Sequence, residues 1–175
     1  MKSLINTKTL CKQLKKDRSI IWKREGSTHY ITNRMYMVRF EELPADVMTT
    51  LFGRFLQIPD DGETLHSING EVSVPKNGLN FTSVYQPGNA VIEGRVTSYI
   101  KNLDKSQARV IKFNDRFAVV NDEYFKLSEE KNQVFITSDS LMAPMYFANK
   151  QLLILPFRIA EESDPIDEII QNFGI

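Results

Sequence analysis

The spacing of apolar residues predicts two helices in the first third of the chain. Leu10 and Leu14 are four residues apart within the segment 7–16, so their side chains share one helical face while lysines occupy another. Pro44 suits the first turn of a second helix, because a missing backbone N–H does no harm there. We predict this second helix over 44–55, with an apolar face formed by Val47, Met48, Leu51 and Phe55.

Short runs rich in β-branched and aromatic residues predict strands. Three lie between the two helices, at 19–24, 28–33 and 35–40, with turn-forming residues between them. Six more follow in the second half of the chain, at 90–100, 108–114, 117–121, 132–138, 144–148 and 151–157. The last two are expected to form a core hairpin with its turn at 148–150, and the segment 122–128 has the spacing of one helical turn.

Residues 57–88 interrupt this pattern. Proline, glycine and asparagine are frequent there, which indicates a loop-rich insertion with short strands near 71–75 and 79–85. No internal repeat is evident. The fold class that follows is α+β, with a mainly antiparallel sheet and two to four short helices in one domain over 1–159.

The chain after this domain, 160–175, is an acidic tail. Ser163 suits a helix cap, and the residues that would share one helical face are Ile166, Ile169, Ile170 and Phe173. The net charge of the chain is zero, but the charges are unevenly distributed along it. Residues 1–40 hold ten Lys or Arg against two acids (+8), 41–70 hold one base against six acids (−5), and 159–175 hold five acids (−5). The basic head and acidic tail could attract each other, or each could face a partner of opposite sign.

Side chains suited to catalysis are few. His29 and His66 have no partner at metal or triad spacing, and neither a phosphate-binding glycine loop nor a Gly-x-Ser-x-Gly turn is present. Cys11 is the single cysteine, which excludes an internal disulfide, and a small partly buried side chain fits it better than a nucleophile without a base. Adjacent acids such as Glu129 and Glu130 would point to opposite faces of a strand. We therefore expect no enzyme, no metal site and no cofactor.

Membrane insertion and export are not expected either. No apolar run approaches the roughly 18 to 20 residues of a spanning helix, and no signal-peptide core precedes the polar residues at 7–9. The sequence predicts a cytoplasmic protein.

The segment 110–159 resembles a known family. A strand ending in an asparagine turn, a tyrosine-bearing segment that starts a helix, and later strands containing MAPMYF (142–147) and ILPFRI (154–159) are similar to one repeat of the bacterial DNA sliding clamp of the β-subunit type. A weaker similarity is YITNRMYMV at 30–38. The family has three repeats per chain and closes a ring, whereas this chain has room for one repeat or one and a half. It also continues beyond the Arg158-Ile159 position at which the family ends.

The resemblance implies that helices face DNA and that their basic side chains contact phosphates without reading bases. Such contacts give salt-dependent, sequence-independent binding. The DNA-contacting residues would be Lys8, Lys12, Lys15, Lys16 and Arg18. A solvated helix face is the alternative that the residues leave open.

Two segments would bind protein partners by the same resemblance. In the family, positions matching Leu155, Pro156, Phe157 and Arg158 border a pocket that receives short peptides, although a core strand is the alternative here. The terminus IIQNFGI is similar to the peptides that bind such clamps, with Gln171, Phe173 and Ile175 as its contacts. It could fold back on its own domain or reach into another protein's groove.

These expectations lead to a non-enzymatic clamp-fold accessory protein of DNA replication or repair, encoded by a phage or mobile element, that binds DNA or a replication partner. A second hypothesis is an inhibitor of a host nuclease or CRISPR-type defence complex that mimics nucleic acid. Its acidic surface would consist of Glu41, Glu42, Asp60, Asp61, Glu161, Glu162, Asp167 and Glu168. A third is a homo-oligomer formed by pairing of an exposed strand edge.

Overall fold

The computed structural model describes residues 4–75, 81, 92–103, 105–114, 116–138, 140 and 143–157. The helices of this part are α1 (Thr7–Lys16), α2 (Ala45–Phe55) and the single turn α4 (Asp122–Phe125). The strands are β1 (Ser19–Glu25), β2 (Thr28–Thr32), β3 (Tyr36–Phe40), β4 (Thr64–Ile68), β5 (Glu71–Ser73), β6 (Ile92–Asn102), β7 (Gln107–Phe113), β8 (Arg116–Asn121), β9 (Gln133–Ile136), β10 (Met145–Phe147) and β11 (Leu152–Ile154).

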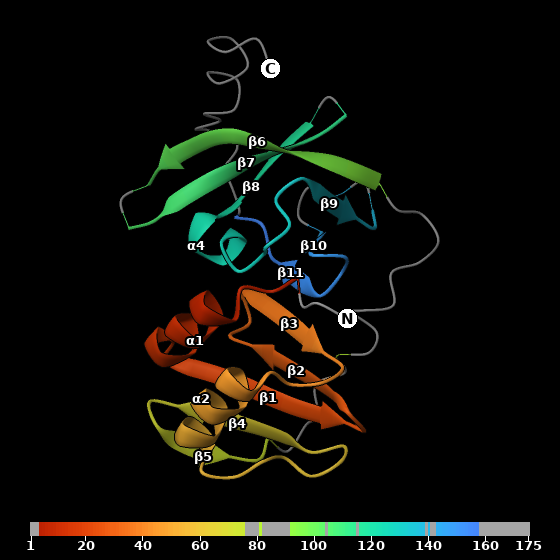
Figure 1. Cartoon of the computed structure of the whole chain (residues 1–175). Coiled ribbons are helices and arrows are strands. Elements are labelled where there is room, and N and C mark those ends of the chain that lie inside the picture. Colours follow the sequence, from red (N-terminus) through yellow and green to blue (C-terminus); the bar gives the residue numbers. More distant parts are fainter. Residues whose placement is uncertain are drawn as a thin grey trace.

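These strands form one sheet in the order β5-β4-β1-β2-β3-β11-β10-β9-β6-β7-β8 (Figure 1). Each neighbouring pair is antiparallel. The predicted α+β class, with a mainly antiparallel sheet and a few short helices, is confirmed.

Two stretches of the sheet share the same connectivity. In the first, the meander β1-β2-β3 precedes α2, and β4 then returns to pair with β1 while β5 pairs on its outer side. In the second, β6-β7-β8 precedes α4, β9 returns to pair with β6, and β10 pairs on its outer side. Strand β11 joins the two stretches, because it pairs with both β10 and β3. The sequence shows no such repeat, since strand order depends on pairing between segments far apart in the chain.

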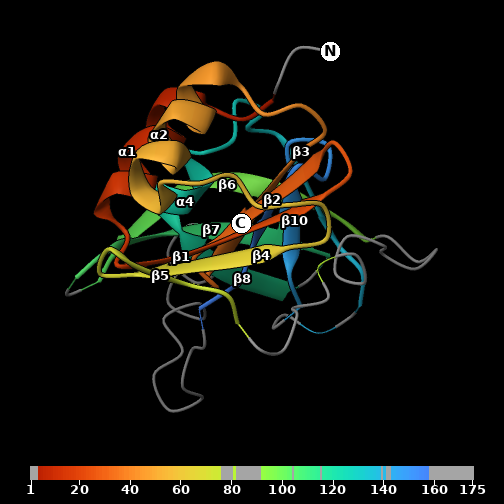
Figure 2. The same cartoon turned by 90° about the horizontal axis from the view of Figure 1, so that it is seen from below.

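Helices α1, α2 and α4 lie on one face of the sheet (Figure 2). Side chains alternate between the two faces of each strand, so Trp22 packs under the helices while Ile21 faces the other way. One buried cluster on the helix side runs from Ile5 to Ile154 and includes residues of both stretches. On the opposite face, Tyr30 stacks on Phe81 with ring centroids 5.9 Å apart. Both faces therefore contribute to the core.

Helix α1 has the predicted bounds, and local chemistry explains its start. The Oδ1 atom of Asn6 accepts a hydrogen bond from the Thr9 N–H at 2.9 Å, which satisfies one of the unpaired donors of the first turn. Leu10 and Leu14 are buried, as their spacing predicts. Helix α2 starts one residue later than predicted, because Pro44 has an extended backbone with ψ 144° and precedes the first helical turn.

Two strand predictions are wrong in extent. Strand β4 lies inside the region predicted to be loop-rich, and it is held by pairing with β1 and β5 rather than by a long apolar run. The strand predicted over 151–157 ends at Ile154. Beyond it, the Leu155 N–H donates to the Met35 carbonyl at 2.9 Å and the Phe157 N–H to the Val119 carbonyl at 2.8 Å. Residues 155–157 therefore run from the start of β3 to β8.

The predicted core hairpin is confirmed as β10-β11. Its turn contains three consecutive residues with left-handed backbone, Ala148, Asn149 and Lys150, at φ 49°, 49° and 65°. None of them is glycine, so the turn carries local strain. The segments predicted at 79–85 and 160–175 lie outside the described residues, apart from Phe81.

Candidate functional site

The predicted basic face of α1 is exposed. The side chains of Lys8, Lys12, Lys15 and Lys16 face solvent, and Arg18 is exposed just after the helix. The opposite face, which contains Leu10, Gln13 and Leu14, is buried against the sheet and α2. The helix therefore presents a cationic surface while its apolar face is fully used in the core.

Some of these cations have acidic residues close by, and others do not. The Lys16 ammonium lies 2.8 Å from the Glu123 carboxylate, and this pair raises the pKa of Lys16. Lys8 lines a hollow of about 750 Å³ together with Glu129 and Glu130. No ion pair with another described residue involves the remaining cations, which are Lys12, Lys15 and Arg18.

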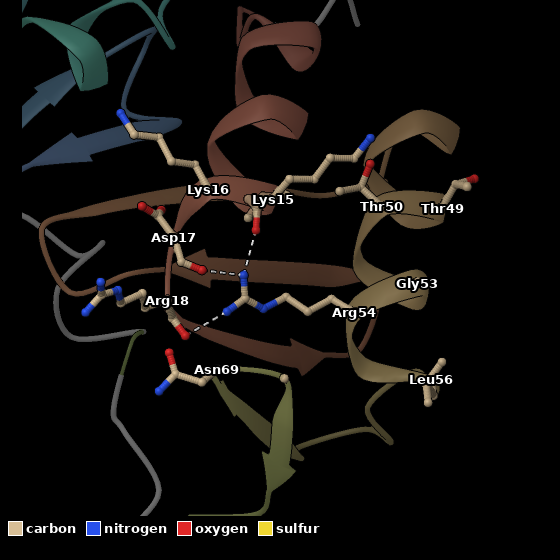
Figure 3. Close-up of a pocket in the computed structure, with 12 residues that line it drawn as sticks. Lys15, Lys16, Asp17, Arg18, Thr49, Thr50, Gly53, Arg54, Leu56 and Asn69 are labelled. Carbon is tan, nitrogen blue, oxygen red and sulfur yellow. Dashed lines mark hydrogen bonds between the residues drawn. The ribbon is translucent and has the colours of Figure 1, made fainter.

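A groove of about 780 Å³ lies between the C-terminal halves of α1 and α2, and we call it the α1–α2 groove. The lining residues are Leu14, Lys15, Lys16, Asp17, Arg18, Thr49, Thr50, Gly53, Arg54, Leu56, Asn69 and Gly70. Figure 3 shows Lys15 reaching toward Thr50 on α2 and Arg18 pointing away on the other side. The two cations therefore stand at opposite ends of the groove, which suits an extended anionic ligand better than a single small anion.

Arg54 crosses the floor of this groove and holds the end of α1 in place. Its Nη1 atom donates to the carbonyls of Leu14 and Asp17, each at 2.6 Å, and its Nη2 atom donates to the Arg18 carbonyl at 3.0 Å (Figure 3). The Nη2 atom also donates to the Ser67 carbonyl at 3.4 Å. Its Nε atom donates to the Ser67 hydroxyl at 3.1 Å. A guanidinium has five N–H donors, and these five bonds employ them all. Arg54 therefore caps the helix and has no donor left for a ligand.

Asp17 anchors the same helix end from the other side. Its carboxylate accepts hydrogen bonds from Gln13 at 2.7 Å and from Asn33 and the Tyr36 hydroxyl at 3.1 Å. Asn33 also donates to the Tyr124 hydroxyl at 3.2 Å. Burial raises the pKa of Asp17 although these donors oppose it, and burial with the adjacent carboxylate raises the pKa of Tyr36 well above its usual value. This network joins α1 to β3 and α4, so it links the two stretches of the sheet.

The α2 wall of the groove departs from helix preferences at two positions. Gly53 lies inside the helix, where glycine costs about 1 kcal/mol relative to alanine. A Cβ there would meet nothing within 4 Å, so packing within the described part of the molecule does not require glycine. Leu56 ends the helix at φ 57°, a left-handed position that favours glycine, and is 77% exposed. Sequence spacing alone gave no signal for this pair.

A second charged cluster, around Asp122, is structural. The Asp122 side chain is fully buried and lies 2.7 Å from Arg109 Nε and 2.8 Å from Lys126 Nζ. Burial opposes its ionisation, but the hydrogen bonds from Lys126 and Arg109 prevail and hold the pKa of Asp122 below its usual value. Arg109 also covers the ring of Phe125 at 4.7 Å, which fixes α4 on β7.

Each of the two histidines contacts a side chain of strand β1. The Trp22 indole donates to His29 Nδ1 at 3.1 Å, and the Ser19 hydroxyl lies 2.8 Å from His66 Nε2. Burial lowers the pKa of both imidazoles. Among the described residues, no carboxylate hydrogen-bonds to His66 and no group of three or more His, Cys, Asp or Glu side chains could hold a metal ion.

Three of the residues predicted to bind partners are described, and they pack inside the molecule. Leu155 and Phe157 are half-buried, and each packs against an apolar cluster on the face opposite the helices. Pro156 between them is buried. This placement agrees with a core role, and a peptide pocket at this position stays a prediction. The remaining partner residues, Arg158, Gln171, Phe173 and Ile175, lie outside the described residues.

Four of the eight residues of the predicted acidic surface lie in the described part of the chain. Glu41 and Glu42 are exposed after β3, and Glu41 lies 3.6 Å from Arg39. Asp60 and Asp61 are exposed too, but the Asp61 carboxylate accepts a hydrogen bond from the Gly26 N–H at 2.6 Å. The other four acids, Glu161, Glu162, Asp167 and Glu168, lie outside the described residues.

No helix in the described part of the chain is long and apolar enough to cross a membrane. Comparison of the chain with protein-family models, with curated proteins and with solved structures found no match. Function must therefore be argued from the α1 surface and the α1–α2 groove.

Proposed function

We propose that this chain is a non-enzymatic accessory protein of DNA replication or repair that binds duplex DNA through the exposed face of α1. The observation that carries the proposal is a set of exposed cations on α1 and the turn after it, namely Lys12, Lys15 and Arg18. They form no ion pair with a described residue and, unlike Lys8, do not line the hollow that contains Glu129 and Glu130. The similarity of segment 110–159 to a sliding-clamp repeat supports the accessory role.

Contacts of this kind would be to phosphates. Lysine and arginine side chains on the outside of a helix neutralise the DNA backbone, release its counterions and carry no sequence information. The proposed contacts come from cations alone, since the groove-lining residues include no aromatic side chain, and a duplex is the ligand that we propose. Arg54 would contribute indirectly, because it fixes the position of Lys15 and Arg18 through the backbone at the end of α1.

The salt dependence of binding tests the proposal. Three phosphate contacts predict that the logarithm of the association constant falls with the logarithm of salt concentration with a slope of about −2.7. Replacing Lys12 and Lys15 together with glutamate should reduce the slope to about −0.9 or abolish binding. Fluorescence anisotropy with a labelled duplex of unrelated sequence measures both quantities.

A matched charge control separates a local site from general electrostatic attraction. Lys101 at the end of β6 and Lys105 in the following turn lie in the second half of the chain, outside α1 and the groove lining, and their replacement by glutamate changes the net charge equally. We expect the control to retain the wild-type slope. Equal loss of binding in both double variants, or no binding by the wild type at low salt, would contradict the proposal.

A further inference from the structure

The α2 wall of the α1–α2 groove contains two residues that are unfavourable for the helix itself. The helix would be more stable with alanine at position 53 and glycine at position 56, yet Gly53 and Leu56 occupy these positions, and both line the groove. Local preferences that are broken together on one surface are expected where a ligand binds. Gly53 allows close approach of a backbone, and Leu56 offers an exposed apolar contact.

The neighbouring side chains define the chemistry of the occupant. Phe52 and Ile58 are 49% and 44% exposed, which adds apolar surface next to Leu56. Lys15 and Arg18 supply positive charge at the two ends of the groove (Figure 3). A matching ligand is a peptide segment in which carboxylates stand close to bulky apolar side chains.

The C-terminal segment 161–175 has this composition. It contains the acids Glu161, Glu162, Asp164, Asp167 and Glu168 and the apolar residues Ile166, Ile169, Ile170, Phe173 and Ile175. The described chain ends at Phe157, beside β8. Only residues 158–160 connect Phe157 to this segment, and at about 3.3 Å per residue they span about 13 Å. Strand β8 lies at one end of the sheet and β4 and β5, beside the groove, at the other (Figure 1). This connection is too short to bring the segment into the groove of its own chain, so the groove that it can reach is that of a second copy.

We propose that segment 161–175 docks in the α1–α2 groove of a second copy of the chain. Its carboxylates then meet Lys15 and Arg18, and an apolar side chain packs on Leu56 above Gly53. Docking does not depend on DNA binding. If the proposed function holds, however, the tail and DNA compete for Lys15 and Arg18, and the tail lowers the affinity for DNA.

Disulfide trapping in the full-length protein tests the docking. In a Cys11→Ser background, one cysteine is placed in the groove by Thr49→Cys and one in the tail by Asn172→Cys. The matched control replaces Thr49→Cys with Lys105→Cys, in the exposed turn after β6. With oxidised glutathione we expect the groove pair to cross-link at least tenfold faster than the control pair. On a non-reducing gel we expect the cross-linked product to be a dimer, and a cross-linked monomer would overturn docking in a second copy.

Two variants then test the contacts. Lys15→Glu combined with Arg18→Glu should slow the groove cross-link at least fivefold, and so should Leu56→Gly. Leu56→Gly should also raise the urea midpoint of unfolding, because glycine relieves the left-handed backbone, so its slower cross-linking cannot come from unfolding. Equal cross-linking rates at positions 49 and 105, or an unchanged rate in Leu56→Gly, would overturn the proposal. Neither the cross-linking rate nor the urea midpoint involves DNA. A negative result in these measurements would therefore not affect the salt-dependence test of the proposed function.

Discussion

Arg54 should be one of the most sensitive surface-facing positions of the protein. Its guanidinium makes five hydrogen bonds, two of them at 2.6 Å to the carbonyls of Leu14 and Asp17 at the end of α1. Lysine has three donors on one nitrogen, so Arg54→Lys leaves at least two acceptors without their partner. An unsatisfied, partly buried acceptor costs about 1–3 kcal/mol. Because Arg54 is only half-buried and water can replace part of the loss, we expect a destabilisation of about 2–3 kcal/mol.

Urea denaturation followed by circular dichroism measures this effect. With a slope of about 2 kcal/mol per molar urea, typical for small proteins, the midpoint should fall by about 1–1.5 M. Arg24→Lys is the matched control, because within the described part of the chain the Arg24 side chain donates one hydrogen bond, from Nε to the Gly26 carbonyl at 2.9 Å. Its cost should stay below about 1 kcal/mol. If Arg54→Lys shifted the midpoint no further than Arg24→Lys, the assignment of Arg54 as the cap of α1 would be refuted.

Three further substitutions should change the stability of the folded protein, two by lowering it and one by raising it. Asp122→Asn should destabilise the protein by about 3 kcal/mol, because Arg109 loses its buried counter-charge. The folded-state pKa of Asp122 lies below that of the unfolded chain, so its contribution is complete above the unfolded pKa near 4 and is lost as pH falls further. Comparing wild type and Asp122→Asn by urea denaturation from pH 7 to pH 3 should show the gap closing; a constant gap would argue against an ionised Asp122. Lys150→Gly should stabilise the protein by about 1 kcal/mol in thermal unfolding, because glycine adopts φ 65° without strain, whereas a lower melting temperature would contradict the strained turn. Gly94→Ala should cost about 1–3 kcal/mol in urea, because its Cβ would overlap the ring of Phe113, and a neutral result would show that this ring moves freely.

Much of the local structure follows from the sequence because it depends on near neighbours. The i, i+4 spacing of Leu10 and Leu14 and the cap at Asn6 are contained within one segment, and α1 has the predicted bounds. The β10-β11 hairpin is equally local, since its strands are separated by a short turn. The exposure of the basic α1 face follows from the same periodicity. Strand β4 was missed because its residues form a strand only through pairing with β1 and β5.

The sequence by itself determined the α+β class, the bounds of α1, the core hairpin and the separation of a basic head from an acidic tail. Tertiary structure alone decided the repeated connectivity, the enclosure of Asp122 and the use of Leu155 to Phe157 inside the molecule. It also decided which cations remain without an acidic partner, because Glu123 is far from Lys16 in sequence but lies 2.8 Å away in space. The α1–α2 groove was likewise decided by the tertiary structure alone. Lys15, Gly53 and Asn69 come from three separate segments, and only the packing of α1 and α2 on the sheet brings them to one surface.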